Sequence, residues 1–259
     1  MFTGSKLNHL KKIRVAPVSY LNTKPLLYGI EHHPVKNDIE LVEGYPSKIA
    51  QMLIDDEVDL GLIPVAAMLK LKEAHIITDY CIGAEVTVAS VCIFSEVPME
   101  QIEKIYLDYQ SRTSVNLARV LLKEYWRKDI ELVDAKGEEF RHQLKGRTAG
   151  VVIGDRALEQ RLHSKYVYDL AEAWIEHTGL PFVFAAWISN KQLPQHFISA
   201  FNEANASGLK QLDKVVAENP FPAFDLMKYY TQCISYELTR QKRRGLDLFL
   251  DKLTKLDKT

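Results

Sequence analysis

Three short segments carry polar side chains where a predicted strand gives way to a predicted helix. They are residues 19–23 (SYLNT), 111–114 (SRTS) and 154–155 (GD). Hydroxyl, amide and carboxylate groups at such a junction lie beside the free N–H groups of the following helix, which attract anions. The chemistry of these segments is that of a site for a small anionic ligand.

The first segment follows the predicted strand 13–18 and precedes a helix that begins near Pro25, a residue suited to a first helical turn. Asn22 or Thr23 can cap this helix by accepting a backbone N–H. If Thr23 is the cap, Asn22 remains available to a ligand. Both interpretations, helix cap and ligand contact, stay open at this point.

The second segment places three hydroxyls and a guanidinium at the start of the amphipathic helix 111–126. Together with the free N–H groups they can form a carboxylate or phosphate site. The alternative is an ordinary helix cap with Arg112 in solvent. The spacing is not that of a phosphate-binding P-loop, which requires Gly-x-x-x-x-Gly-Lys-Ser/Thr.

In the third segment, Asp155 is most simply the N-cap of the predicted helix 155–162, and Gly154 permits a ligand to approach the backbone closely. Elsewhere we interpret Phe182, Phe184 and Trp187 as core residues. The basic run 242–244 is expected to form a solvated helix face, because three charges do not make a nucleic-acid site.

The composition excludes several classes of protein. The 259 residues are 47% apolar and 26% charged, and 33 Lys and Arg against 34 Asp and Glu give a net charge of −1. This balance argues against a nucleic-acid partner. The absence of a run of 18 apolar residues argues against a membrane span. No apolar stretch follows the charged residues 1–12, so we expect no secretory signal and a cytoplasmic protein.

The sequence carries no familiar metal or nucleophile motif. Cys81, Cys92 and Cys233 are odd in number and widely spaced, so we expect them to be reduced. Cys-x-x-Cys, His-x-x-x-His and Gly-x-Ser-x-Gly are all absent. We therefore expect no metal and no cofactor.

Strand and helix patterns alternate along most of the chain, which predicts an α/β protein with parallel strands and crossover helices. The predicted strands are 13–18, 39–42, 60–63, 105–107, 130–133, 149–153, 166–168 and 182–188. Helices are predicted after most of them, and the last third reads as helices 194–212, 225–233 and 237–255.

The β-rich run 75–95 is too long for one strand, so we expect it to bend or to pass between two sheets. A second crossing near residues 179–184 would place the middle of the chain in its own domain. We predict two α/β domains joined by two crossing strands: residues 1–91 plus 184–259, and an inserted domain 92–183. Ligands in such folds lie at the carboxyl ends of strands, here in the cleft between the domains.

Six segments, in order along the chain, resemble the chorismate dehydratases of the futalosine route to menaquinone. They are VAPVSYLNTKP (15–25), DLGLIP (59–64), VASV (88–91), LDYQSRTSVNLARVLL (107–122), VIGDRAL (152–158) and DLAEAWIEHTGLPFVFAAW (169–187). The resemblance implies a type II periplasmic-binding-protein fold used in the cytosol as an enzyme. It also implies a hydro-lyase that removes water from chorismate, a dianion, to give 3-enolpyruvylbenzoate.

The resemblance assigns site residues one by one. Asn22, in the SYLN motif, is expected to be catalytic; the expected substrate-binding residues are Tyr20, Ser90, Thr113, Ser114, Gly154 and Asp155. A neutral amide is a poor proton acceptor, so we expect Asn22 to position or polarise the departing hydroxyl, with a substrate carboxylate taking the proton. The family usually has Gly where this chain has Val86. We therefore expect a local backbone difference near Ser90.

Two other functions stay open. A dihydroxynaphthoate synthase of the same pathway shares the fold, but that family carries a His where this chain has Gly154 and Asp155. A non-catalytic small-anion-binding protein also fits the fold, because fold alone does not settle function. We expect a small-molecule substrate, no nucleic-acid or membrane partner, and a monomer or homodimer.

Overall fold

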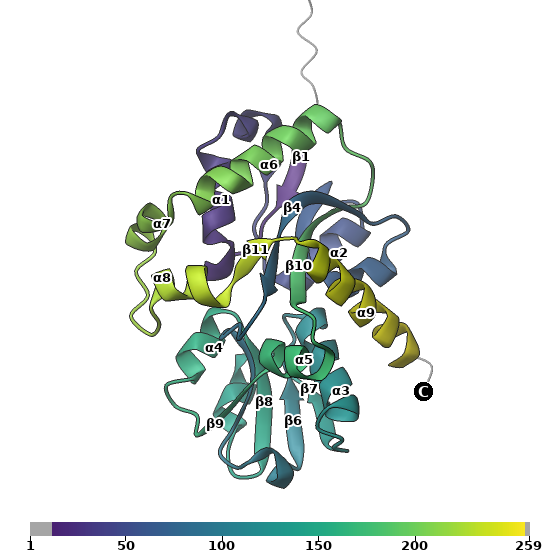
Figure 1. The fold of residues 1–259 in the computed structure, drawn as a ribbon, viewed down its shortest axis with the longest axis vertical. Helices are drawn as coiled ribbons and strands as arrows, with labels where there is room; N and C mark the ends of the chain where they lie inside the picture. Colours follow the sequence, from purple (N-terminus) through teal and green to yellow (C-terminus); the bar gives the residue numbers. More distant parts are fainter. Residues whose placement is uncertain (1–11, 257–259) are drawn as a thin grey trace, which may run out of the picture.

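The computed structural model describes residues 12–256. The expectation of no secretory signal concerns residues 1–12, all but one of which lie outside this range. In Figure 1 the chain forms two lobes along the long axis, each built on its own β-sheet. In the described part of the chain, no helix is long and apolar enough to cross a membrane.

The sheet in the upper half of Figure 1 has six strands in the order β11-β4-β10-β3-β1-β2. The strands β1 (Ile13–Ala16), β2 (Ile39–Leu41) and β3 (Leu60–Pro64) are parallel, as the alternating pattern predicts. The strands β4 (His75–Ala84), β10 (Phe182–Ser189) and β11 (Ser235–Glu237) extend this sheet in antiparallel pairs.

The lower sheet has five strands in the order β7-β6-β8-β5-β9. Its parallel strands are β6 (Lys104–Leu107), β7 (Glu131–Asp134) and β8 (Thr148–Ile153). β5 (Val91–Ser95) pairs antiparallel with both β8 and β9 (Tyr166–Asp169). The β-rich run 75–95 therefore splits into β4 and β5, which belong to different sheets, as the sequence predicts.

Helices cover both sheets. They are α1 (Lys24–Glu31), α2 (Pro46–Ile54), α3 (Arg112–Glu124), α4 (Asp155–Gln160), α5 (Leu170–Thr178), α6 (Gln195–Leu209), α7 (Leu212–Glu218), α8 (Leu226–Lys228) and α9 (Arg240–Leu256). Short 3-10 turns lie at Leu21–Thr23, Pro34–Asp38, Val65–Lys70, Met99–Gln101 and Glu138–Gln143, and a π turn lies at Tyr229–Cys233.

The helix α1, which carries the SYLNT loop at its start, packs closely against α6. A Cβ atom built on Gly208 would lie 1.9 Å from the Pro25 carbonyl oxygen, and one built on Gly29 would lie 2.0 Å from the Ala204 carbonyl oxygen. Only glycine permits this approach of two backbones. The contact fixes the direction in which the loop before α1 meets the lower lobe.

Several sequence predictions fail at the level of element boundaries. The predicted helix 237–255 begins too early, because Glu237 ends β11 and α9 begins at Arg240. The predicted helix 225–233 is one short α turn followed by a π turn. The predicted helix 194–212 corresponds to α6, which ends at Leu209, and Leu212 already belongs to α7. The segments 66–71 and 139–144 form 3-10 turns rather than α-helices.

The aromatic residues predicted as core are buried: Phe182, Phe184 and Trp187 are at most 6% exposed. Phe182 packs edge-on against Phe249 of α9, with ring centroids 4.9 Å apart. The prediction for the basic run 242–244 is wrong for its first residue, because Lys242 is fully buried. Cys81, Cys92 and Cys233 are buried and free.

Candidate active site between the two lobes

The carboxyl ends of the parallel strands of both sheets face each other across the lobe interface. The loop after β1 brings Tyr20 and Leu21 to this interface, where the Leu21 N–H donates to Asp155 Oδ1 at 3.0 Å. The Tyr20 hydroxyl donates to Gln110 Oε1 of the lower lobe. After β3, the Ala66 N–H donates to Thr113 Oγ1 at 3.0 Å. Residues from all three sequence motifs therefore meet here.

Asn22 lies in the 3-10 turn that leads into α1. Its side-chain oxygen accepts from Thr23 Oγ1 at 3.2 Å, and its backbone carbonyl accepts from the Tyr236 hydroxyl at 2.9 Å. Thr23 stands at the N-cap position of α1 without a side-chain cap hydrogen bond. The cap interpretation is therefore wrong for both residues. No hydrogen bond from the Asn22 side-chain nitrogen is found within residues 12–256, which leaves a donor for a ligand.

Ser90 lies at the lower end of the crossing segment between β4 and β5 and is fully buried. Its hydroxyl accepts from the Tyr229 hydroxyl at 2.7 Å, and its carbonyl accepts from the Gly154 N–H at 2.8 Å. The unusual backbone in this segment lies at Ala89, with φ of 63°, while Val86 is exposed and has no positive φ.

The Asp169 carboxylate holds the strained backbone at Ala89 in place. It accepts from the Ala89 N–H at 2.7 Å, from Thr87 Oγ1 at 2.6 Å and from the Val88 N–H at 3.1 Å. It also caps α5 by accepting from the Ala171 N–H at 3.0 Å. A non-glycine residue at positive φ costs about 1–3 kcal/mol and persists only where its surroundings hold it. The hydrogen bonds to Asp169 hold Ala89, the residue before Ser90, in this conformation.

Gly154 turns the chain from β8 into α4 with φ of 65°, a conformation that favours glycine. A Cβ atom at this position would lie 2.9 Å from the Tyr20 ring. Gly154, not Asp155, occupies the N-cap position of α4, so the predicted capping role of Asp155 is wrong. Its carboxylate instead reaches across the cleft to Leu21.

Burial raises the pKa of Asp155 to about 6, and the charge of Glu159 adds to this effect. The hydrogen bond from the Leu21 N–H opposes it. A carboxyl group with this pKa exists in both protonation states near neutral pH, which suits it to acid–base chemistry.

The SRTS segment forms the first turn of α3. Ser111 is a helix cap, because its hydroxyl accepts from the Ser114 N–H at 3.2 Å, and the two hydroxyls lie 3.0 Å apart. Thr113 and Ser114 are both buried. The structure thus confirms the capping interpretation for Ser111, and it brings Thr113 against Ala66 rather than against Asn22.

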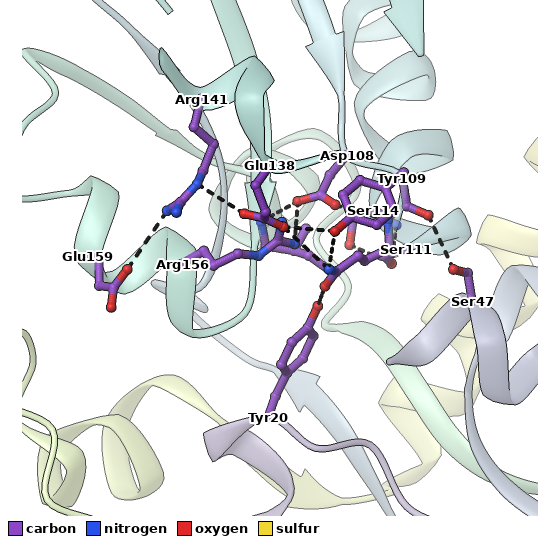
Figure 2. A network of polar contacts seen from close by, with 12 residues as sticks. Tyr20, Ser47, Asp108, Tyr109, Ser111, Ser114, Glu138, Arg141, Arg156 and Glu159 are labelled. Carbon is purple, nitrogen blue, oxygen red and sulfur yellow. Dashed lines mark hydrogen bonds and ion pairs between the residues drawn. The ribbon is translucent and has the colours of Figure 1, made fainter. Parts of the chain in front are cut away.

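A partly buried ion-pair network behind this segment is not indicated by the motifs. Figure 2 shows Arg156 between two carboxylates: Nη2 lies 2.7 Å from Asp108 Oδ2, and Nη1 lies 2.6 Å from Glu138 Oε1. Burial raises the pKa of Asp108, and Arg156 opposes that shift. The Tyr109 hydroxyl donates to Glu138 and accepts from Gln110 Nε2, so this network orients the Gln110 side chain that meets Tyr20. Asp108 directly follows the predicted strand 105–107, and Arg156 comes just after the Gly154-Asp155 motif; these positions are the sequence signals that point to them.

Three tyrosines of the C-terminal part, Tyr229, Tyr230 and Tyr236, also belong to this region. Tyr229 contacts Ser90 and Tyr236 contacts Asn22, as described above. The Asp155 charge acts on the Tyr230 phenol. The sequence carries no signal for them, because Tyr229 and Tyr230 fall in the predicted helix 225–233 and Tyr236 falls between two predicted helices.

The fold defines the class of protein. Solved structures similar to this chain include an Archaeoglobus fulgidus protein, with a TM-score of 0.74 and 16% identity, covering 96% of this chain and 99% of that one. Another is the alkanesulfonate-binding protein SsuA from Xanthomonas axonopodis pv. citri, with a TM-score of 0.60 and 13% identity, covering 95% and 93%. The protein therefore has the α/β fold of periplasmic binding proteins, as predicted.

The chain belongs to the menaquinone biosynthesis family, whose profile matches residues 13–255. It is 27% identical over 259 residues to the chorismate dehydratase of Thermus thermophilus, covering 90% of this chain and 92% of that protein. It is 26% identical over 246 residues to the chorismate dehydratase of Campylobacter jejuni, covering 90% and 94%. The resemblance found in the sequence motifs is thereby confirmed.

Proposed function

We propose that this protein is a chorismate dehydratase, a cytoplasmic hydro-lyase that converts chorismate to 3-enolpyruvylbenzoate in menaquinone biosynthesis. The family match and the names of both curated relatives support this function. The structural observation that carries it is the contact of the SYLNT loop with Asp155 across the cleft. This contact holds the residue before Asn22 against a titratable carboxyl group, because the donor is the Leu21 backbone N–H.

The reaction breaks two bonds of the substrate. The ring hydroxyl leaves, and the neighbouring ring carbon, which bears the enolpyruvyl ether, loses its proton. The ring becomes aromatic, so the overall direction is favourable and the protein must chiefly orient the substrate and assist the two departures. Three roles follow: holding the substrate's two carboxylates, protonating the leaving hydroxyl, and accepting the carbon-bound proton.

Asp155 is the group we assign to the leaving hydroxyl. Its raised pKa of about 6 rises further when a dianion binds nearby, because a like charge disfavours the ionised form. The protonated carboxyl can then transfer its proton to the departing oxygen, which leaves as water. One water is released, and the Asp155 carboxylate regains its proton before the next turnover.

Asn22 serves as a donor that positions the departing hydroxyl or a substrate carboxylate. The Asn22 side-chain nitrogen carries the hydrogens that can be donated. The Tyr236 hydroxyl holds the residue in place by donating to the Asn22 backbone carbonyl. Because a neutral amide is a poor proton acceptor, the proton on the ring carbon passes to a substrate carboxylate held beside it. The proton count balances: one is added to the hydroxyl and one is taken from carbon.

The remaining predicted residues form the walls that bind the dianion. Thr113 and Ser114 lie in the first turn of α3, where free N–H groups and the helix dipole favour a carboxylate. The Thr113 hydroxyl is bonded to Ala66 of the other lobe, and the Tyr20 hydroxyl to Gln110. Substrate entry therefore requires the lobes to separate and these contacts to be exchanged for contacts with the ligand.

We propose that the moving bodies are residues 1–91 with 184–259, and residues 92–183. The sheet membership of β5 and β10 supports these limits to within two residues, because β5 begins at Val91 in the lower sheet and β10 begins at Phe182 in the upper sheet. The crossing segment at Ala89 and Ser90 would act as one hinge. Asp169 and Tyr229 support that segment from either side.

The function is tested by giving purified protein a large molar excess of chorismate. Consumption of many equivalents, with formation of a product that has lost one water, supports a dehydratase. Binding of one equivalent without consumption would instead support a small-anion-binding protein of the same fold. Conversion by a preparation of the Asn22→Ala variant at the wild-type rate would show that a contaminating enzyme or a different site is responsible.

A further inference from the structure

The segment after α8 closes one side of the candidate site. In Figure 1, α8 and the turn that follows it lie in the upper lobe on the same side of the molecule as α4, the lower-lobe helix that begins at Asp155. The π turn Tyr229–Cys233 and the strand β11 carry Tyr229, Tyr230 and Tyr236, which are 0%, 2% and 6% exposed. Single π turns occur frequently at functional sites.

Two of these tyrosines have their hydroxyls engaged inside the protein. Tyr229 donates to Ser90 Oγ at 2.7 Å, and Tyr236 donates to the Asn22 carbonyl at 2.9 Å. Each of these bonds holds a residue that the sequence motifs place in the site. The two phenols are therefore structural supports for Ser90 and Asn22.

Tyr230 differs from its neighbours. Its hydroxyl is buried and has no hydrogen-bond partner within residues 12–256. Leaving a buried hydroxyl unpaired costs free energy, and native proteins do so rarely and at positions with a specific role. Burial, together with the charge of Asp155, raises the pKa of Tyr230, so the phenol stays protonated and keeps its hydrogen to donate.

The charges around the site indicate what the Tyr230 hydroxyl could donate to. Arg156, a cation within the network of Figure 2, is already paired with Asp108 and Glu138. Lys24 is the other cation whose charge acts on Asp155. Uncharged donors beside Asp155 would add attraction for a dianionic substrate to that of Lys24. A phenol that donates to a carboxylate forms one of the stronger hydrogen bonds in proteins.

We infer that Tyr230 is a further substrate-binding residue, whose buried hydroxyl donates a hydrogen bond to a carboxylate oxygen of the dianionic substrate. This inference rests on the proposed function. It gives the π turn a role in binding, because the turn directs Tyr230 and Tyr229 toward different partners. The Tyr229 hydroxyl donates to Ser90, and the Tyr230 hydroxyl donates to the substrate.

The test compares wild-type protein with Tyr230→Phe and with Tyr166→Phe, a control on β9 in the lower sheet. For each protein, kcat and KM for chorismate, the Kd of the product and the melting temperature are measured. We expect Tyr230→Phe to lower kcat/KM and weaken product binding about tenfold to a hundredfold. Its melting temperature should equal or exceed that of wild type, because no internal hydrogen bond is lost. Tyr166→Phe should match wild type in every measurement.

Two results would overturn the inference while leaving the proposed function intact. One is a Tyr230→Phe protein whose kcat/KM and product Kd stay within twofold of wild type. The other is a lowered melting temperature with unchanged product binding, which would show that the hydroxyl has a partner within the protein. A wild-type protein that does not consume chorismate would overturn the proposed function itself, and this inference with it.

Discussion

Asp155 is the residue on which most of the proposed chemistry depends. Its carboxyl is set in place from two directions: Gly154 turns the chain so that α4 begins at Asp155, and the Leu21 N–H meets it from the other lobe. Burial keeps its pKa near 6. A surface aspartate would be fully ionised at neutral pH and unable to protonate a leaving hydroxyl.

We expect kcat/KM to fall as the pH rises above about 6. The free protein needs the protonated carboxyl, and the protonated fraction drops tenfold per pH unit above the pKa. The decline of kcat should begin at higher pH, because the bound dianion raises the pKa further. Steady-state rates between pH 5 and pH 9 measure both. A kcat/KM that rises through pH 6 would contradict the acid role.

Asp155→Asn should separate activity from stability. We expect kcat to fall by at least about a hundredfold, since the amide cannot transfer a proton in this way. The pKa of Asp155 is raised in the folded state, so its ionised form costs folding free energy once the pH exceeds the unfolded value of about 4. Asp155→Asn should therefore be as stable as wild type at pH 7, or more stable, in urea unfolding. A destabilised variant would show that the carboxylate is mainly structural.

Asn22→Ala should lower kcat by about a hundredfold or more, because an aligned hydrogen bond to the departing group contributes mainly in the transition state. The backbone bond from Tyr236 to the Asn22 carbonyl survives the substitution, so the fold is retained. Asn116→Ala in α3, outside the site, is the matched control. Equal rates in both variants would remove Asn22 from the mechanism.

The sequence predicts which loops hold these residues but not how each side chain is used. Residues 22 and 155 could be named because their motifs stand at strand ends, whereas Ser90 is named by the family resemblance alone. The capping role predicted for Asp155 is wrong because the N-cap falls on Gly154. Tyr230 could not be named, because its position depends on a π turn that no local pattern distinguishes from a helix.

At the scale of elements, Lys242 shows how one side chain joins two of them. It lies on α9, and its Nζ donates to the Ser235 carbonyl at 3.1 Å and to the Glu237 carbonyl, both of β11. Nζ also lies 3.3 Å from Glu85 Oε1. Since Tyr236 stands between these two carbonyls and bonds Asn22, Lys242 fixes the strand that supports the SYLNT loop.

Lys242→Met should destabilise the protein by about 3 kcal/mol, because it leaves buried carbonyl groups of β11 without a donor. Arg244→Met, two residues further along the same helix, should change stability by no more than about 0.5 kcal/mol. Chemical unfolding of the two variants gives the comparison. Similar stabilities for both would mean that the ammonium group of Lys242 is not needed for β11.

The elements were predictable where their signals are local. The parallel strands β1, β2 and β3 and the helix α3 follow from hydrophobic pattern and from Pro and Ser positions. The strand β11 was not predictable, because three residues form a strand only through pairing with β4, far away in sequence. The carbonyls of β11 accept from the Lys242 ammonium group. Because β11 could not be predicted, the sequence predicts a solvated helix face for the basic run that contains Lys242.

At the scale of the whole molecule, the proposed function requires two lobes that meet and separate. Contacts across the interface join Tyr20 to Gln110, Leu21 to Asp155 and Ala66 to Thr113. The division into lobes was predictable because the β-rich run 75–95 exceeds one strand. The side-chain pairs that close the interface were not, because each joins residues far apart in the chain.

Gly154→Ala should hinder closure of the interface between the two lobes. The new Cβ would lie 2.9 Å from the Tyr20 ring, and alanine at φ of 65° is strained by about 1–3 kcal/mol. We expect KM for chorismate to rise and the protein to lose stability. Gly137→Ala is the control, because its Cβ has open space and its φ of 171° is extended. A Gly154→Ala protein with wild-type KM and stability would contradict the tight contact described here.

The most direct test of the central claim is the mass and yield of the product formed from chorismate by purified protein. We expect complete conversion of a large excess of chorismate to one aromatic product that has lost a single water and keeps the enolpyruvyl group. Asn22→Ala, prepared in parallel, should yield little of it. Chorismate recovered unchanged, or a product that has lost the enolpyruvyl group instead of water, would contradict the assignment of this protein as a chorismate dehydratase.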